Sequence, residues 1–353
     1  SRGNQRRGSG HPTGRRVNGP RHGRAARPHA LEARRAPLAS PLRIAVVGLG
    51  RWGPVQLQAF ATAPGARVTA VADPDPARLR AHCPSGATPS TTLGALLERS
   101  DVEAVVLATP SATHARLAER ALRAGRHVLV EKPLALDVAE AERLVRLAAG
   151  RPEIGVMGHL LEHHAAIAGL ASLVESGAIG DLARIEARRL ATRVTRDDPW
   201  WTLAPHDLGL CLRFAGAPLR LDVRRCAGRA RAEVVFPRGV KAEIEVGFGA
   251  PRRVRELRLL GTRGAARLDD APGGARVTLD TPSSGTRCLT FATAELPLAR
   301  QARAFVAACR GEPIPLRCGL EEGLAIVRCL AAAPVEPARP DAPTLQPPPS
   351  GSW

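Results

Sequence analysis

The first part of the chain alternates short apolar runs with longer stretches of helical periodicity. The periodic stretches include "HARLAERALRAG" (114–125) and "VAEAERLVRLAAG" (138–150). Apolar runs of strand length lie at 44–47, 67–73, 102–108, 127–130 and 154–158. Such runs fit strands that are covered on both faces, and their alternation with helices predicts a doubly wound parallel sheet. We therefore expect an α/β Rossmann domain over residues 43–154.

The pattern changes from about residue 155, where apolar and polar positions alternate with a period of two. Two helical stretches follow, near 296–310 and 319–332. Strand-like runs separated by Gly/Pro turns lie at 182–191, 231–236, 241–248, 253–261, 265–270, 275–280 and 289–292. This pattern predicts an α+β second domain, residues 155–333, built on a mostly antiparallel open sheet. One face of such a sheet takes the helices, and the other is free for a second subunit.

The segments outside these two domains lack a periodic apolar pattern. Residues 1–42 hold ten arginines and one acid, Glu32, which gives +9 of the chain's net charge of +18. We expect this basic arm and the Pro-rich stretch 334–353 to be disordered. The arm has no aromatic residues for base stacking, so we expect no specific nucleic-acid role. It also lacks the apolar core of a secretory signal.

Composition narrows the location and the chemistry further. Seven scattered cysteines without a C-x-x-C pair argue for reduced thiols in a cytoplasm and against a zinc ribbon or a disulfide framework. No run approaches the roughly 18 apolar residues of a membrane span. The chain has no tyrosine, which excludes the Tyr–Lys acid/base pair of short-chain dehydrogenases. Lysine and histidine are left as the proton carriers.

A glycine-rich turn joins the first apolar run to the first helical stretch. Its sequence, "VVGLGRWG", gives Gly48, Gly50 and Gly53 the G-x-G-x-x-G spacing between a strand and a helix. One glycine permits the tight turn, one the approach of a pyrophosphate, and one the close packing of helix on strand. The second strand ends in Asp73, where an acid fits a ribose 2′-hydroxyl and disfavours a 2′-phosphate. The pattern predicts NAD as the cofactor.

Two further loops follow predicted strands of the same sheet. Thr109, Pro110 and Ser111 come after the strand at 102–108, and Glu131 and Lys132 come after the strand at 127–130. In an open parallel sheet the ligand lies at the carboxyl ends of the strands. We therefore expect both loops at the cofactor edge.

Lysine is rare in this chain. Of 51 basic residues only Lys132 and Lys241 are lysine, and the rest are arginine. A buried ammonium can lose its proton, whereas a guanidinium stays charged. Lys241 falls in a predicted hairpin strand, where we expect a solvated side chain. Lys132 combines rarity with a position at the cofactor edge, so it is the stronger candidate for chemistry.

These stretches resemble the Gfo/Idh/MocA (glucose–fructose oxidoreductase / inositol dehydrogenase) family. The likeness covers about residues 43–333. Its matching pieces are "VVGLGRWG", "VADPDPAR", "DVEAVVLATPSATH", "ALRAGRHVLVEKPLA", "LAPHDLGL" and "EEGLAIVRCLAAA". The resemblance implies an NAD(P)-dependent oxidoreductase that acts on a sugar and assembles as a homodimer or homotetramer.

The resemblance also implies roles for single residues. The lysine of the E-K-P motif, here Lys132, lies between nicotinamide and substrate, and its bond to proline is often cis. A histidine of the second domain, here His206, is the acid/base. A cation beside the substrate oxygen stabilises a developing alkoxide and can relay its proton. The implied cofactor-binding set is Gly48, Leu49, Gly50, Arg51, Trp52, Gly53, Asp73, Thr109, Pro110, Ser111, His114, Glu131 and Lys132.

The stretch "DDPWWTLAPHDLGL" holds the candidate substrate residues of the second domain. A sugar could stack on Trp200 or Trp201, although both rings could equally fill the core. Many relatives have an aspartate four residues before the histidine, where this chain has Thr202. Asp207 or Asp198 could take over that role, and we include Trp201, Thr202 and Asp207 among the substrate candidates.

The segment "HLLEH" (159–163) matches the H-x-x-E-H pattern of a zinc protease. It follows a strand at the domain crossover, where relatives present substrate-contacting residues, so we reject the zinc interpretation and expect no metal. His159, Glu162 and His163 are better interpreted as lining of the substrate pocket.

Three functions remain open. An NAD-dependent sugar dehydrogenase is favoured, and "GFGAPRRVRELRLLGTRGAARLDD" (247–270) is similar to nucleotide-sugar 3-dehydrogenases, which favours a nucleotide-linked or amino sugar. An NADPH-dependent keto-sugar reductase is the alternative enzyme, since Arg78 and Arg80 could neutralise a 2′-phosphate. A non-catalytic dinucleotide-binding regulator is the third, suggested by Thr202.

Overall fold

A computed structural model describes residues 40–226, 228–271, 274–291, 295–314 and 317–332. The expected Pro-rich tail, and the basic arm up to residue 39, lie outside these described residues.

Six parallel strands form the first sheet, in the order β3-β2-β1-β4-β5-β6. The strands are β1 (Leu42–Val47), β2 (Ala66–Ala72), β3 (Thr88–Ser90), β4 (Ala104–Leu107), β5 (His127–Glu131) and β6 (Gly155–Gly158). Helices alternate with them: α1 (Gly53–Ala61), α2 (Pro76–His82), α3 (Leu93–Leu97), α4 (His114–Arg123) and α5 (Val138–Ala148). The strand order reverses direction at β1, between β2 and β4, which is where such sheets bind their ligands.

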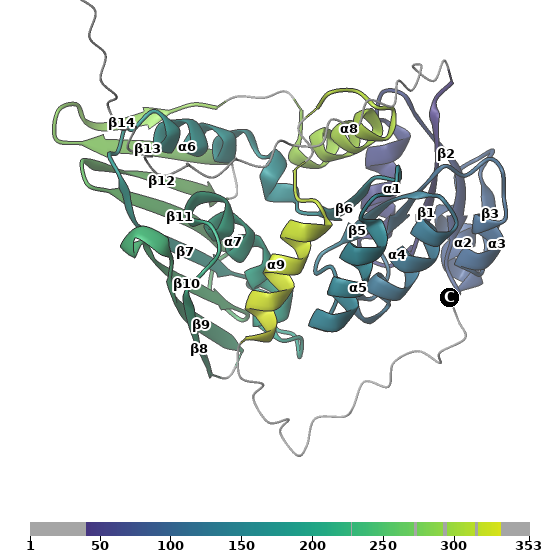
Figure 1. Ribbon diagram of the computed structural model, residues 1–353, viewed down its shortest axis with the longest axis horizontal. Coiled ribbons are helices and arrows are strands. Elements are labelled where there is room, and N and C mark those ends of the chain that lie inside the picture. The colour runs from purple at the N-terminus through teal and green to yellow at the C-terminus, as the bar shows by residue number, and fades with distance from the viewer. Residues whose placement is uncertain (1–39, 227, 272–273, 292–294, 315–316, 333–353) are drawn as a thin grey trace, which may run out of the picture. The chain divides into compact units, whose positions relative to one another are not determined.

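Both faces of this sheet are covered (Figure 1). Along β1, Ile44 and Val46 pack into a cluster with Phe60 of α1, while Ala45 and Val47 point into the cluster on the opposite face. Successive side chains of a strand face opposite ways, so an apolar residue at every position needs helices on both sides. The predicted Rossmann architecture is confirmed.

A C-terminal helix also covers the parallel sheet. Helix α8 (Pro297–Cys309) packs on α1, where Phe305 and Phe60 meet edge to face with ring centroids 6.0 Å apart. Strand β6 pairs with β5 and belongs to the parallel sheet, although it lies beyond residue 154. The domain limits 43–154 and 155–333 remain predictions. The contacts of β6 and α8 show that residues beyond 154 also pack in the first domain.

Eight strands form the second sheet, in the order β14-β13-β12-β11-β7-β10-β9-β8. They are β7 (Leu182–Leu190), β8 (Arg220–Cys226), β9 (Arg229–Val235), β10 (Lys241–Gly247), β11 (Val254–Gly261), β12 (Gly264–Ala271), β13 (Gly274–Thr281) and β14 (Gly285–Leu289). Only the β10–β7 pair is parallel, and the other pairs are antiparallel. The expected mostly antiparallel second sheet is confirmed.

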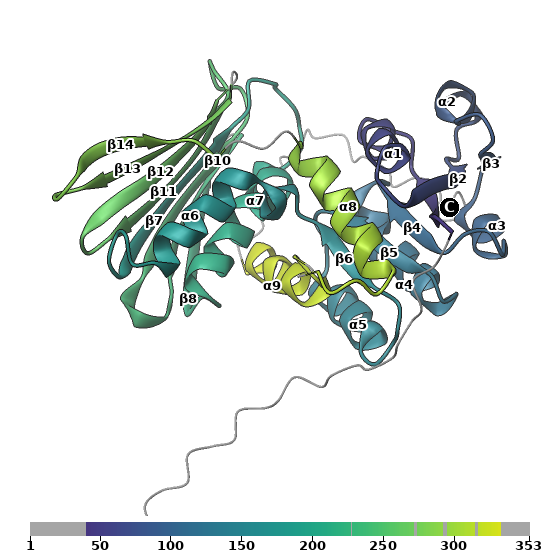
Figure 2. The ribbon, with the colours of Figure 1, turned by 90° about the horizontal axis from the view of Figure 1, so that it is seen from above.

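Helices lie against one face of the second sheet (Figure 2). Helix α6 (Ala165–Glu175) packs on β12 and β13, and α7 (Pro199–Ala215) packs on β7 and β10. Helix α9 (Leu320–Ala331) packs on both α7 and α5, so it contacts a helix of each sheet. Within the described part of the chain, no helix is both long enough and apolar enough to cross a bilayer.

One local expectation was wrong, and one helix was not predicted. The last strand covers Gly285–Leu289 and shares only Leu289 with the predicted run 289–292, because the tight turn after β13 sets the register of the hairpin. The segment around His206 is helix α7, which the pattern did not predict because Pro205 lies inside it. The side chain of Asp198 caps this helix by accepting from the amide of Trp200.

Candidate active site

The glycine turn has the shape that a dinucleotide requires. Gly48 has φ +88°, and a Cβ on Gly53 would lie 1.9 Å from the carbonyl oxygen of Gly48, so both positions need glycine. Around Gly50 the nearest atom to such a Cβ is 3.9 Å away, so the backbone there stays open to a ligand. No side chain caps the N-terminus of α1. Open backbone beside an uncapped helix start fits a pyrophosphate.

Asp73 lies directly beneath this turn and is 1% exposed. Its carboxylate accepts hydrogen bonds from the amide of Leu49 at 2.7 Å and from the amide of Asp75 at 2.9 Å. Arg78 comes within 3.6 Å of the same carboxylate. Asp73 therefore holds the glycine turn in place as well as supplying negative charge beside it.

The E-K-P loop is tied to the glycine turn through Glu131. This buried carboxylate accepts from the indole N–H of Trp52, from Gln56 Nε2 at 2.5 Å and from the amide of Lys132 at 3.2 Å. Burial raises the pKa of Glu131 above its usual range, against the nearby Lys132 ammonium, which lowers it. The Glu131 side chain is thus used to hold the loop that carries Lys132.

His114 ties the two strand-end loops together. Its ring nitrogens lie 2.7 Å from the carbonyl oxygen of Pro133 and 2.9 Å from that of Thr109. The residue is 1% exposed, and burial lowers its pKa. We expected His114 among the cofactor-binding residues; it lines the cavity, and its neutral ring donates to one of these two carbonyls.

Lys132 reaches from the parallel sheet to helix α7. Its Nζ donates to the main-chain oxygen of Thr202 at 3.0 Å, and the Lys132–Pro133 peptide bond is cis. Burial is the main cause that lowers the Lys132 pKa; Glu131 opposes it, while Arg189 and other arginines add to it. A lysine in such surroundings gives up its proton more readily than one in water.

His206 faces the same cavity from α7. No protein atom among the described residues is within hydrogen-bond distance of its buried Nδ1. Burial lowers the His206 pKa well below its usual range, and the positive charges of Arg189 and Lys132 lower it further. The imidazole is therefore neutral at neutral pH and able to accept a proton.

These groups line one cavity of about 450 Å³ at the carboxyl edge of the parallel sheet. Its lining consists of Arg51, Trp52, Ala108, Thr109, Ser111, His114, Glu131, Lys132, Gly158, Leu160, Ala191, Arg193, Thr202, Leu203, His206, Arg255, Leu298 and Gln301. Several predicted cofactor-binding residues, including Lys132, thus line the same cavity as His206 and Thr202. Four cations and one acid contribute to the lining, so the cavity favours an anionic ligand.

Sequence reasoning missed three of these polar groups. Arg193 lies in the loop after β7, Arg255 in β11 and Gln301 in α8. Gln301 is 3% exposed, and its Oε1 has no partner among the described residues. No local motif marks these residues, because they reach the cavity only through the folding of distant segments.

Several expected substrate residues lie elsewhere. Asp207 is 1% exposed and forms a bidentate pair with Arg189 at 2.8 and 2.9 Å, so its carboxylate is turned away from the cavity. Asp198 caps α7 and pairs with Arg225. Neither aspartate is among the residues that line the cavity with Thr202. Trp201 packs against the core and is not part of the cavity lining.

The 159–163 segment also differs from expectation. His159 and Glu162 line a separate cavity of about 340 Å³, and Glu162 pairs with Arg213. His163 belongs to neither lining. The segment forms a 3₁₀ turn (Leu160–His163) and contributes Leu160 to the cavity of about 450 Å³.

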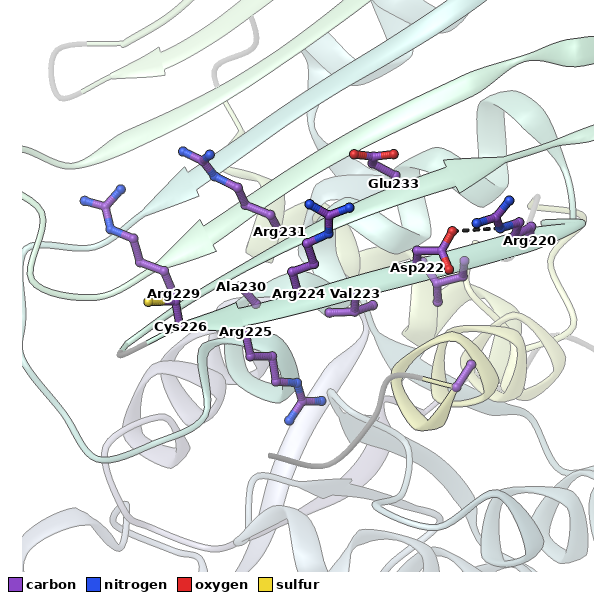
Figure 3. A pocket seen from close by; sticks show the side chains of 12 residues that line it. Arg220, Asp222, Val223, Arg224, Arg225, Cys226, Arg229, Ala230, Arg231 and Glu233 are labelled. Atoms are coloured by element: carbon purple, nitrogen blue, oxygen red, sulfur yellow. Dashed lines mark ion pairs between the residues drawn. The ribbon is translucent and has the colours of Figure 1, made fainter. Parts of the chain in front are cut away.

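A larger hollow of about 800 Å³ lies along strands β8 and β9 (Figure 3). Arg224 stands directly opposite Arg231 in the register, and Figure 3 shows both side chains rising from the sheet. The residues that line the hollow include arginines, two acids and Cys226. Lys132 and His206 line the smaller cavity instead.

Known proteins resemble both the sequence and the fold. The model of the GFO_IDH_MocA family, described as an oxidoreductase family with an NAD-binding Rossmann fold, matches residues 42–159. A dTDP-3,4-didehydro-2,6-dideoxy-alpha-D-glucose 3-reductase of Streptomyces violaceoruber is 35% identical over 245 residues, which cover 63% of this chain and 72% of the relative.

A second relative is the UDP-N-acetylglucosamine 3-dehydrogenase of Acidithiobacillus ferrooxidans. It is 35% identical over 52% of this chain and 57% of its own length. Its solved structure matches with a TM-score of 0.73 at 25% identity, over 83% of this chain and 96% of that one.

A solved protein of Magnetospirillum magnetotacticum matches with a TM-score of 0.75 at 30% identity, over 84% of this chain and 100% of that one. These likenesses extend across both sheets, well beyond the segment that the family model matches. The chain belongs to the GFO_IDH_MocA oxidoreductase family, whose Rossmann fold binds NAD.

Proposed function

We propose that this protein transfers a hydride between NAD(P) and the hydroxyl or keto carbon of a sugar or nucleotide sugar. The observation that carries the proposal is that Lys132 and His206 share one cavity beside the glycine turn. Both are proton carriers in surroundings that lower their pKa. Such a pair handles the proton that must leave the substrate oxygen when hydride leaves the carbon.

The residues for the cofactor and for the proton are separate. The open backbone at Gly50 and the uncapped start of α1 would hold the dinucleotide. When bound, its nicotinamide supplies the hydride acceptor or donor. The Lys132 ammonium stabilises negative charge on the substrate oxygen and relays its proton, and neutral His206 is the final proton acceptor. In the reverse direction the same two groups return the proton to a keto oxygen.

A nucleotide-linked sugar suits the charge of the cavity. Arg51, Arg193 and Arg255 line it together with Lys132. The Arg193 guanidinium lies 3.9 Å from the carboxylate of Asp197. A diphosphate would satisfy these guanidinium donors. The names of the two relatives, a dTDP-sugar 3-reductase and a UDP-sugar 3-dehydrogenase, agree with this class and with either direction of reaction.

We further propose a homodimer or homotetramer formed through the helix-free face of the eight-stranded sheet. Arg188 pairs with Glu245 and Glu256, and Arg184 pairs with Glu243, all across neighbouring strands. Such a surface of alternating charge is complementary to a second copy of itself. We also propose a reducing compartment such as the cytoplasm, because the seven cysteines are scattered along the sequence without a C-x-x-C pair.

The test of the function is a melting-shift screen followed by a turnover assay. The full chain is heated with NAD, NADP, UDP-linked and dTDP-linked sugars, and each stabilising pair is then assayed by the absorbance of the reduced nicotinamide. We expect a dinucleotide to raise Tm, and turnover with a nucleotide sugar. A protein that binds the dinucleotide but transfers no hydride across the panel would instead support the non-catalytic regulator.

The cofactor preference follows from Asp73 and gives a second prediction. We expect NAD(H) to bind more tightly than NADP(H), because the carboxylate beneath the glycine turn repels a 2′-phosphate. Arg78 lies beside this carboxylate, so Arg78→Ala should weaken NADP(H) further while NAD(H) changes little. Calorimetry measures both affinities, and Arg67→Ala, an exposed arginine at the opposite end of β2, is the matched control. Tighter NADPH binding by the parent would favour the keto-sugar reductase.

A further inference from the structure

His159 is a buried histidine that contacts His206 without lining the catalytic cavity. It follows β6 and is 1% exposed. Its Nε2 donates to the main-chain oxygen of His206 at 3.1 Å, and the two rings lie 5.5 Å apart with an angle of 35° between them. Since His159 lines the separate cavity that contains Glu162, it can act on substrate only through His206.

Helix α7 is shaped to receive this ring. A Cβ on Gly209 would lie 2.8 Å from His159 Cε1 and 2.9 Å from His159 Nε2. Glycine is among the least favourable residues in a helix interior, so its presence one turn after His206 calls for a packing reason. The space that Gly209 leaves open is filled by the His159 imidazole.

The turn of α7 that carries His206 depends on contacts from outside the helix. Pro205 has no N–H, so the helical bond to the carbonyl of Trp201 is missing. Lys132 donates to the carbonyl of Thr202, and His159 donates to the carbonyl of His206. Two side chains of the parallel sheet thus hold this turn on either side of the proline.

The surroundings keep His159 neutral. Burial lowers its pKa to about 3, and the charges of Arg189, His163 and Lys132 add to this effect. Its Nδ1 lies 3.9 Å from a carboxylate oxygen of Glu162, which is itself paired with Arg213 of α7. His159 is therefore a neutral N–H donor at neutral pH, and it places no positive charge beside His206.

We propose that His159, seated against Gly209, is a positioning residue that holds the His206 imidazole in the orientation needed for proton transfer. The inference rests on the proposed role of His206 as acid/base. It assigns His159 to orientation of α7, in place of the substrate contact that the sequence suggested.

The test follows the His206 ring directly and needs no substrate. Imidazole ¹⁵N–¹H spectra of the full chain are recorded against pH, with the His206 signal assigned from His206→Asn. We expect His159→Leu, which removes the donor, and Gly209→Ala, which displaces the ring, to shift this signal. The His206 pKa should rise in both, because a loosened turn regains solvent near Lys132, Arg189 and Arg255, the charged groups that face it. His159→Gln, which restores an N–H donor, should stay closer to the parent.

Turnover gives the second measurement once a substrate is found. His159→Leu and Gly209→Ala should lower kcat about 10- to 100-fold, as expected for a misplaced catalytic group, with NAD affinity nearly unchanged. An unchanged His206 signal in both variants overturns the proposal, as does His159→Gln behaving like His159→Leu. The spectra do not require hydride transfer. If the parent shows no turnover, the proposed function is refuted, but the spectra still test the positioning role of His159.

Discussion

Replacing Lys132 by alanine should lower turnover about 10²- to 10⁴-fold, the usual scale for a positioned acid/base group. The ammonium is held in the cavity by its bond to the carbonyl of Thr202, and burial lowers its pKa. Without it, the developing charge on the substrate oxygen loses its cation and the proton loses a carrier. The measurement is kcat with the substrate identified by the screen.

Cofactor affinity separates this loss from a general defect. The contacts expected for pyrophosphate and ribose lie at Gly50 and Asp73, so Lys132→Ala should change the Kd of NAD far less than it changes kcat. Lys241→Ala is the matched control, since the only other lysine is exposed on β10. A comparable loss of turnover in Lys241→Ala would mean that the effect is not specific to the cavity.

His206→Asn should reduce turnover by a comparable factor of about 10²–10⁴, again as for a lost acid/base group, while NAD binding stays intact. Asparagine keeps a polar side chain of similar reach but does not exchange a proton near neutral pH. His82→Asn, an exposed histidine on α2, is the control. Parent-like turnover in His206→Asn would remove this residue from the proton-transfer step.

The pH dependence has a definite sign. The pKa of His206 lies well below its ordinary value of 6.5. The imidazole therefore stays neutral from alkaline pH to well below pH 6.5. The proton acceptor is therefore lost only at more acidic pH, when His206 becomes protonated. At the alkaline end the Lys132 ammonium loses its charge below its usual pKa, so the oxidation should decline there earlier than an exposed lysine would allow.

Much of the fold could be predicted because its signals are local. Every residue of β4 is buried, and that strand read as a continuous apolar run, whereas β9 alternates exposed arginine with buried alanine. The glycine turn could also be predicted, since contacts between adjacent elements require glycine at positions 48 and 53. The predicted catalytic pair, Lys132 and His206, came from rarity, position at a strand end and family resemblance.

What the sequence did not predict depends on long-range packing. Arg193 and Arg255 line the cavity only because β7 and β11 are neighbours in the second sheet. The sequence suggested that Asp207 was available for substrate, because no local pattern indicates its pairing with Arg189. The role of His159 likewise needs Gly209, a residue fifty positions away that has no side chain to give a signal.

The most direct test of the central claim is the turnover of Lys132→Arg, measured beside its affinity for NAD. Arginine keeps the positive charge, but its head group is larger and does not give up its proton. If Lys132 both stabilises the alkoxide and carries the proton, the variant should bind NAD like the parent and still lose most of its turnover. Parent-like turnover in Lys132→Arg would show that charge alone is needed at this position, and it would contradict the proton-transfer role of Lys132.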